Sequence, residues 1–247
     1  MKLIPLLQLS PGREALCLVG GGGKTTLLYR LAHEALETGS VCVTTSTHIA
    51  LPSAEQALYV QTFDEQAFLQ GLQQQKVLCI GSLTDLRDEA GVQKLSMAPE
   101  PWLAFAQSHT DWLFCEADGA RHFPAKVPNE TEPVLLPGSA VLAVFGLSAI
   151  GKPLQEVCFR APLALSLLGT KDSREPLTVS QAARLLTSPL GQRKGVPEDR
   201  FYRVFLNQAD DENGLALARQ LAASIHEILP GALVAAGSLQ KGVYHLC

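Results

Sequence analysis

The chain has 247 residues, which is long enough for one large domain with a substantial core. Apolar residues make up 47% of it and charged residues only 18%, as in soluble globular proteins. The formal net charge of −4 gives no basic field and argues against nucleic acid as the main ligand, so any affinity for phosphate must come from a local site.

The beginning of the chain predicts a strand, a glycine-rich loop and a helix. Leu16–Val19 is a short apolar run typical of a buried strand, and Thr26–Glu37 carries apolar residues at helical spacing. Strand, glycine loop and helix in this order are the context of a phosphate-binding loop. Its residues, all candidates for nucleotide binding, are Gly20, Gly21, Gly22, Gly23, Lys24, Thr25 and Thr26.

Each residue type in this loop suits a nucleotide. Consecutive glycines expose backbone N–H groups, and a helix N-terminus favours anions. Lys24 would reach the β- and γ-phosphates, and the Thr25 hydroxyl would bind Mg²⁺. The loop departs from the usual pattern, because Leu18 stands where a glycine is usual, five residues before Gly23. A plain connecting turn is the alternative, but it does not explain a lysine and two threonines that open the helix.

Short apolar runs and helical patterns alternate along the rest of the chain. This alternation predicts an α/β fold, a P-loop NTPase-like three-layer sandwich with a mainly parallel central sheet and helices on both faces. The further predicted strands are Val41–Thr44, Val77–Ile80, Trp112–Cys115, Ala140–Phe145, Tyr202–Leu206 and Ala232–Ala235. The further predicted helices are Asp64–Gln74, Glu100–Gln107, Ala161–Leu168, Val179–Thr187 and Glu212–Leu229.

Two segments interrupt the alternation. We expect Gly81–Pro99, with its charged residues and glycines, and Gly119–Pro137, with four prolines, to be long functional or mobile loops. Residues 169–200 are the candidate for a small helical insertion, because serine, proline and glycine residues end a helix there. No segment has the composition of a linker, so residues 1–247 are expected to form a single domain.

The cysteines and the apolar segments predict the compartment. The six cysteines form no CxxC pair, and four of them lie in predicted strands, as expected of free thiols in a protein core. The apolar segments Met1–Leu9 and Val134–Leu147 resemble neither a signal peptide nor a membrane span. We therefore expect a cytoplasmic protein that does not contact a membrane.

Hydroxyl groups follow the strand at Val41–Thr44. The segment Thr44–His48 stands where a mobile loop could approach the nucleotide or its acceptor, and Thr45 and Thr47 are candidate acceptor contacts. A capping turn rich in threonine and serine explains the same residues equally well.

The strand at Trp112–Cys115 ends in two acids and a glycine. Ligands of open parallel sheets gather at the carboxyl ends of the strands. Glu116 would hold Mg²⁺, and Asp118 would compete for this ion or orient a water molecule. The N–H group of Gly119 would contact the γ-phosphate. The alternative is a turn with solvated acids, but the phosphate-binding loop favours the metal site.

Two cations follow in the proline-rich loop. Arg121 and Lys126 are placed to contact an anionic acceptor, and Arg121 is also the nearest candidate for an arginine finger. Solvated loop charges are the alternative for both.

Asn207 and Asp210 follow another predicted strand. They resemble the Asn-Lys-x-Asp element with which GTPases recognise guanine, in which the carboxylate accepts hydrogen bonds from the base. Gln208 replaces the lysine, so guanine and adenine both remain open, and helix capping explains the same residue types.

Together these segments resemble the selenium-dependent hydroxylase accessory proteins, P-loop proteins associated with selenium-dependent molybdenum hydroxylases. The resemblance covers most of the chain and rests on GGGGKTT at Gly20–Thr26, TTSTHI at Thr44–Ile49, EADGARHFPAKVPNETEP at Glu116–Pro133, FGLSAIGKPL at Phe145–Leu154, and Asn207–Asp210. Gln208 and the bulky Arg121–Phe123 segment depart from the family pattern. The site alone is also similar to that of metallochaperone GTPases that load nickel enzymes.

The resemblance implies a nucleotide-gated accessory factor. It would use Mg²⁺ and ATP or GTP, with Lys24, Glu116 and Asp118 as catalytic residues, and its partner would be a molybdenum hydroxylase or a cofactor precursor of that enzyme. Two classes of function remain open. The protein hydrolyses the nucleotide or transfers a phosphoryl or nucleotidyl group to a small acceptor, or it is a scaffold or chaperone that binds nucleotide without turnover.

Overall fold

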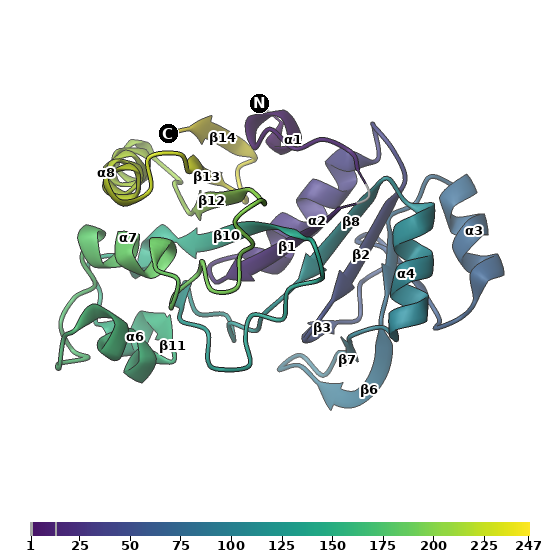
Figure 1. Cartoon of the computed structure of the whole chain (residues 1–247), viewed down its shortest axis with the longest axis horizontal. Helices are drawn as coiled ribbons and strands as arrows, with labels where there is room; N and C mark the ends of the chain where they lie inside the picture. Colours follow the sequence, from purple (N-terminus) through teal and green to yellow (C-terminus); the bar gives the residue numbers. More distant parts are fainter. Residues whose placement is uncertain (1, 13) are drawn as a thin grey trace.

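A computed structural model gives the structure of residues 2–12 and 14–247. In this part of the chain, nine strands form one central sheet (Figure 1). Every pairing in this sheet is parallel except that of its last strand along the chain. In spatial order the strands are β14 (Val243–Leu246), β13 (Leu233–Ser238), β12 (Tyr202–Asn207), β10 (Ala140–Gly146), β1 (Ala15–Gly20), β8 (Trp112–Glu116), β2 (Val41–Thr45), β5 (Leu78–Ile80) and β4 (Leu58–Val60).

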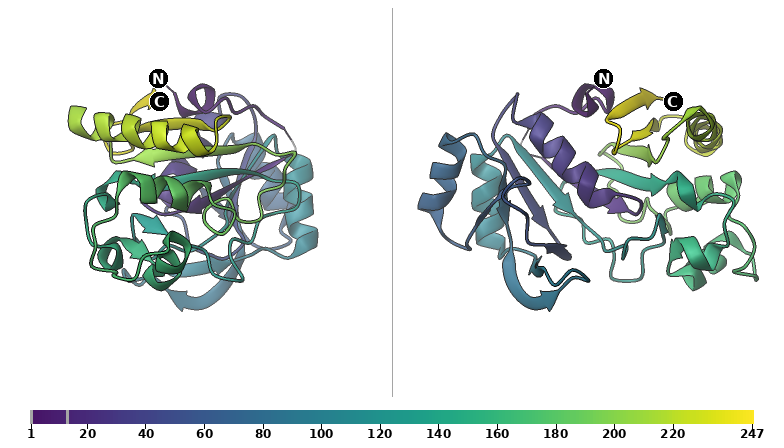
Figure 2. Two further views of the ribbon diagram at one scale, coloured as in Figure 1. Left: turned by 60° about the vertical axis from the view of Figure 1, so that its left-hand side comes forward. Right: turned by 180° about the vertical axis from the view of Figure 1, so that it is seen from behind.

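Helices cover both faces of the sheet. Leu16 and Leu18 of β1 belong to a buried cluster that includes α1 and α2, whereas Cys17 and Val19 belong to a second cluster that includes the other α-helices. The view from behind in Figure 2 shows α2 lying over the sheet. The helices are α1 (Leu3–Leu6), α2 (Lys24–Ala35), α3 (Glu65–Gln73), α4 (Glu100–His109), α5 (Leu154–Val157), α6 (Ala161–Leu168), α7 (Val179–Thr187) and α8 (Glu212–Ile228), with a 3₁₀ turn η1 (Leu147–Ala149).

The predicted three-layer sandwich with a mainly parallel sheet is confirmed. Each strand and helix named from the sequence is present, with small shifts at its ends. Because strands buried on both faces need apolar side chains on both, continuous apolar runs were enough to identify them. The fold is consistent with that of P-loop NTPases.

The expectation that Gly81–Pro99 forms a long loop is wrong. It contains two antiparallel strands, β6 (Ser82–Arg87) and β7 (Gln93–Ser96), and β7 also pairs with β3 (His48–Ala50). The Asp88 carboxylate accepts two backbone N–H groups and so closes the turn between β6 and β7. Most of β6 is exposed, which is why this strand lacks the apolar run on which the sequence prediction depended.

The segment 119–137 is largely irregular, as predicted. It contains only the short strand β9 (Ala125–Lys126), which pairs in parallel with β11 (Cys158–Phe159). In Figure 1 this teal segment passes below the central sheet, between the β3-β7-β6 sheet on one side and α6 with β11 on the other. Its path therefore crosses the edge at which the strands β1, β8 and β2 end.

The chain changes direction around β1. It leaves β1 toward β2 on one side, and after β8 it continues to β10 on the other side. In open α/β sheets the strand ends at such a reversal form a crevice in which ligands bind. The glycine loop that follows β1 therefore lies at the centre of this edge.

Other expectations concern domains, thiols and membranes. Residues 169–200 contain α7, which packs against α6 and α8, and their assignment as an insertion in a single domain stays a prediction. All six cysteines are free, as predicted. Among the described residues, no helix combines the length and apolar character needed to cross a membrane.

Candidate functional site

The loop after β1 has a backbone that requires glycine. Gly20 and Gly22 have φ angles of 98° and 75°, in the left-handed region. A Cβ atom on Gly20 would lie 2.2 Å from the carbonyl oxygen of Val144, and one on Gly22 would lie 2.3 Å from the nitrogen of Gly146. The run of glycines therefore lets the loop pack directly against the end of β10.

The first three amides of the loop are bonded within the protein. The N–H of Gly20 donates to both oxygens of Asp118, at 3.0 and 3.2 Å. The N–H of Gly21 donates to Val144 and that of Gly22 to Phe123, each at 3.0 Å. Gly23 provides no side chain to cap α2, so the amides at the start of this helix remain for an anion.

Lys24, Thr25 and Glu116 meet where β1 and β8 end. The ammonium of Lys24 lies 3.2 Å from the Glu116 carboxylate and 3.2 Å from that of Asp118. The Thr25 hydroxyl donates to Glu116 Oε2 at 2.6 Å. The structure thus brings together the lysine, the hydroxyl and both acids that the sequence predicted as the centre of the site.

The charges continue from Asp118 into the segment after β8. Lys126 lies 3.1 Å from Asp118 and 2.5 Å from Glu132, and Arg160 pairs with the same Glu132 oxygen. Positive and negative groups therefore alternate along a continuous ion-pair network, which we call the buried network. Its members are Glu116, Lys24, Asp118, Lys126, Glu132 and Arg160.

Burial and pairing shift the pKa values within the buried network. Burial lowers the pKa of Lys24, but the charges of Glu116 and Asp118 outweigh this effect and hold it above its usual value. For Lys126 the effect of burial prevails over its two acidic partners, and the pKa is lowered. Burial alone would raise the pKa of Glu132, but Arg160 and Lys126 together hold it below its usual value.

The lowered pKa of Glu132 predicts a loss of stability in acid. Its ionised form stabilises the fold fully above the unfolded-state value of 4.5, and this contribution is lost as the pH falls through the lower folded-state pKa. We therefore expect the difference in unfolding free energy between the wild type and Glu132→Gln to shrink between about pH 7 and about pH 3. Urea titrations of the wild type and of Glu132→Gln at both pH values measure this difference. Exposed Glu130, two residues away, is the matched control as Glu130→Gln, and a difference independent of pH would contradict the assignment.

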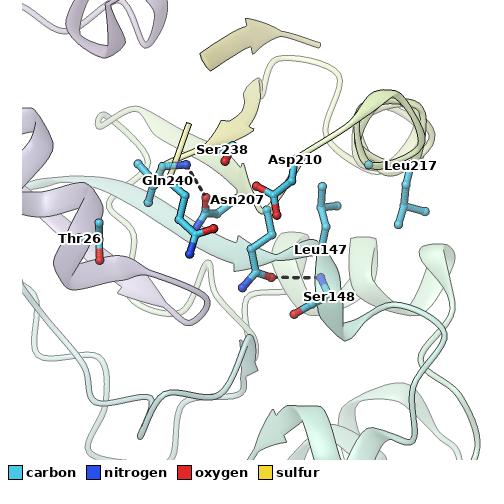
Figure 3. A pocket seen from close by; sticks show the side chains of 11 residues that line it. Thr26, Leu147, Ser148, Asn207, Asp210, Leu217, Ser238 and Gln240 are labelled. Carbon is cyan, nitrogen blue, oxygen red and sulfur yellow. Dashed lines mark hydrogen bonds between the residues drawn. The ribbon is translucent and has the colours of Figure 1, made fainter. Parts of the chain in front are cut away.

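A cavity of about 570 Å³ lies beside the glycine loop, at the ends of β12 and β13. Ligand pockets of small molecules have volumes of this order. Thr26, at the start of α2, lies on one side of it, and Asp210 lies on the other (Figure 3). The remaining walls come from Leu147, Ser148, Asn207, Gln208, Gly214, Leu217, Ser238, Leu239 and Gln240. We call this cavity the first pocket.

The residues of the predicted base-recognition element have different surroundings. Asn207 donates to the carbonyl of Gly22 at 2.7 Å and accepts from the N–H of Leu239 at 3.1 Å, so it ties the glycine loop to the segment after β13. Gln208, with a φ of 71°, accepts from the N–H of Ser148. Exposed Asp210 carries its carboxylate at the wall of the first pocket.

The predicted acceptor contacts lie at different depths. Thr45 is fully buried, and its hydroxyl donates to the Glu116 carbonyl at 2.9 Å. Lys126 is also buried, and its ammonium donates to the Gly119 carbonyl at 2.6 Å. Exposed Arg121 lies over the Phe159 ring, with 5.4 Å between guanidinium carbon and ring centroid. Thr47 lies in the wall of another cavity. That these four residues contact an acceptor stays a prediction. That Gly119 contacts the nucleotide also stays a prediction.

Sequence reasoning missed Glu132 and Arg160 as parts of the site. Glu132 was noted only as part of the family pattern. Arg160 reaches it because β11 pairs with β9, which carries Lys126. Glu132 stands in a proline-rich segment, and Arg160 follows 28 positions later. The local sequence therefore gives no sign that the two side chains are close.

The residues at the ends of β1 and β8 fit a magnesium ion. Thr25 Oγ1 and Glu116 Oε2 are oxygen ligands of the type that Mg²⁺ prefers, and their hydrogen bond holds them 2.6 Å apart. Asp118 already accepts from Gly20 and pairs with two lysines, so Glu116 is the better placed acid. Across residues 2–12 and 14–247, no cluster of three or more His, Cys, Asp or Glu side chains is arranged to hold a metal by itself.

Comparison with known proteins identifies the family. Residues 16–162 match the family described as YqeC protein. A protein of Escherichia coli strain K12, described as "Uncharacterized protein YqeC", is 30% identical over 210 residues, which cover 83% of this chain and 80% of the relative. The chain therefore belongs to the YqeC family.

Proposed function

We propose that this member of the YqeC family binds ATP or GTP with Mg²⁺ and hydrolyses it as an accessory factor in the maturation of a selenium-dependent molybdenum hydroxylase. The observation that carries the nucleotide part is the meeting of Lys24, Thr25 and Glu116 at the uncapped start of α2. The association with the hydroxylase depends on the family resemblance of the sequence.

The phosphates would bind at the start of α2. Its free amides and helix dipole favour an anion, and Lys24 adds a full positive charge beside them. In the structure this ammonium is paired with two carboxylates, so phosphate oxygens would have to compete for it. Binding of a nucleotide would therefore change the partners of Lys24.

Thr25 and Glu116 would hold the magnesium ion. The ion would neutralise phosphate charge during phosphoryl transfer. The hydrogen bond between Thr25 and Glu116 holds the two oxygens side by side, so that one ion would contact both. Asp118, with its contact to Gly20, would keep the glycine loop in register with the end of β8.

The base and ribose would occupy the first pocket. Thr26 lies in its wall and directly follows the phosphate-binding residues in sequence, so a nucleotide bound at α2 would extend into this cavity. The Asp210 carboxylate can accept N–H groups, which guanine offers through N1 and N2 and adenine does not in the same arrangement.

The test is calorimetric titration of the purified chain with ATP and with GTP, with Mg²⁺ and with EDTA, followed by phosphate release on the same samples. We expect binding that requires Mg²⁺, with release of phosphate. Binding without release would overturn hydrolysis and support a nucleotide-gated scaffold. Absence of binding of either nucleotide would overturn the proposal.

Asp210→Ala is expected to remove a preference for guanine. The variant loses the acceptor for two base N–H groups, so the affinity for GTP should fall about 10-fold or more, while that for ATP changes little. Asp211→Ala is unsuitable as a control, because Asp211 caps α8. Exposed Asp85 in β6 is suitable as Asp85→Ala. The same ratio of GTP to ATP affinity in Asp210→Ala and wild type would rule out this role.

A further inference from the structure

The segment Glu116–Phe123, which begins at the end of β8, occupies groups that a phosphate would need. A phosphate-binding loop holds phosphate oxygens with its backbone N–H groups, its lysine and its hydroxyl. In the structure, four such donors are paired with oxygens of this one segment. The donors are Gly20, Gly22, Lys24 and Thr25, and the acceptors are Glu116, Asp118 and the Phe123 carbonyl.

One of these contacts joins two backbones. The Gly22 N–H donates to the Phe123 carbonyl at 3.0 Å. A Cβ atom on Gly21 would lie 2.4 Å from the same carbonyl oxygen, so only glycine allows the two backbones to approach this closely. The Gly22 amide is therefore closed to a phosphate in this conformation.

A turn of unusual conformation carries the Phe123 carbonyl. The Phe123 N–H donates to the Ala120 carbonyl at 3.0 Å, and this bond closes a turn with Arg121 and His122 at its centre. Both central residues have positive φ angles, of 47° and 64°. Turns of this kind usually have glycine, asparagine or aspartate there, because a Cβ atom makes left-handed backbone unfavourable. Residues 120–123 are therefore under backbone strain, and we call them the strained turn.

Contacts with Phe159 hold the strained turn in place. The rings of Phe123 and Phe159 are stacked, with 6.0 Å between their centroids, and the guanidinium of Arg121 lies over the same Phe159 ring. His122, between them, is exposed, so its side chain can be replaced with little effect on packing. Strained backbone that its surroundings hold in place is characteristic of segments that switch conformation.

Both ends of the strained turn are anchored. Before it, the Asp118 carboxylate accepts from the Gly20 N–H and pairs with two lysines. After it, the Pro124 carbonyl accepts from the Gly146 N–H at 2.8 Å. Opening of the turn would therefore be confined to the few residues between these two points.

We propose that the strained turn is an autoinhibitory contact, which a phosphate group of the nucleotide displaces from Gly22. The proposal rests on the proposed function, which supplies the nucleotide. In the closed form the Phe123 carbonyl accepts from the Gly22 amide. In the open form a phosphate oxygen takes its place, and Arg121 and His122 leave the left-handed region. The released strain offsets part of the lost contacts, and the equilibrium between the two forms sets the apparent affinity for nucleotide.

Two substitutions of His122 shift this equilibrium in opposite directions. Glycine tolerates positive φ and favours the closed form, whereas β-branched valine disfavours it. His122→Gly should therefore unfold at a higher urea concentration than the wild type, yet bind the Mg²⁺ complexes of the β,γ-imido analogues of ATP and GTP about 5-fold more weakly. His122→Val should unfold at a lower urea concentration and bind them more tightly. A turn that only supported the fold would give the reverse order of affinities.

Gln75→Gly is the matched control. Gln75 is exposed, has a φ of 52° and precedes β5, at the opposite edge of the sheet from the glycine loop. Its replacement should raise the resistance to urea as His122→Gly does, with no change in nucleotide affinity. Hydrogen exchange of the Phe123 amide, measured by NMR, reports opening directly and should become faster when the analogue is added to the wild type.

Equal affinities in the two His122 variants, tighter binding by His122→Gly, or a Phe123 amide that exchanges no faster with the analogue would overturn the proposal and leave the nucleotide site standing. His122→Gly and its control keep the test decisive if His122→Val does not fold. If neither analogue binds the wild type or either variant, the proposed function fails together with this proposal. Binding by His122→Val alone would support both.

Discussion

Replacing Lys24 with alanine is expected to lower the affinity for the Mg²⁺–nucleotide complex by about 100-fold or more. The variant removes a cation that faces both Glu116 and Asp118, so the phosphates would meet Glu116 without the ammonium of Lys24, and Asp118 would keep Lys126. Truncating one member of a buried charge pair usually costs about 2–5 kcal/mol, and each 1.4 kcal/mol is a factor of ten in affinity. Calorimetric titration measures the change.

The control for this prediction is Lys76→Ala, because Lys76 is exposed and precedes β5 at the opposite edge of the sheet. Lys24→Met retains most of the buried stem and serves if Lys24→Ala does not fold. If a folded Lys24 variant bound the Mg²⁺–nucleotide complex with wild-type affinity, the glycine loop would not be part of the nucleotide site.

The central part of the site could be predicted because its residues directly follow buried strands. Glycine, lysine and threonine after β1, one acid that ends β8 and a second acid just beyond it stand at the carboxyl ends of neighbouring parallel strands. Parallel strands that pair must end at the same edge, so residues that are 91 positions apart, such as Thr25 and Glu116, come into contact. Apolar runs were sufficient evidence for this geometry.

The part of the site that Lys126, Glu132 and Arg160 form could not be predicted in this way. Its contacts depend on the path of the irregular segment 119–137, which the pairing of β9 with β11 fixes. Two-residue strands have no periodicity to detect. The β3-β7-β6 sheet at the same edge was also missed, because most side chains of β6 are exposed and β7 has a single fully buried residue, so neither strand has an apolar run. Local sequence therefore identified the residues that meet at the ends of β1 and β8 but not the groups that surround them.

The buried network suggests how a phosphate bound at Lys24 would affect the ion pairs farther along it. Asp118 contacts Gly20 of the glycine loop, Lys24 and Lys126, so it joins the start of α2 to the ion pairs of Glu132. If phosphate draws Lys24 away from Asp118, this carboxylate retains Lys126 as its cation. The pairing of Lys126 with Glu132 would then weaken, because the Lys126 ammonium would have to neutralise Asp118 without Lys24 while it also pairs with Glu132.

Asp118→Ala is expected to be among the most destabilising single substitutions, with a loss of about 3–5 kcal/mol in the free energy of unfolding. The side chain is fully buried and accepts from the Gly20 N–H, and its removal leaves that amide without its partner and deprives Lys24 and Lys126 of a shared anion. Asp118→Asn should lose less, since its amide oxygen can still accept from Gly20. Urea unfolding followed by the fluorescence of the buried Trp102 and Trp112 measures both, with exposed Asp85→Ala as the control, expected within about 0.5 kcal/mol of the wild type. If Asp118→Ala were as stable as Asp85→Ala, Asp118 would not be the group that holds the glycine loop to the end of β8.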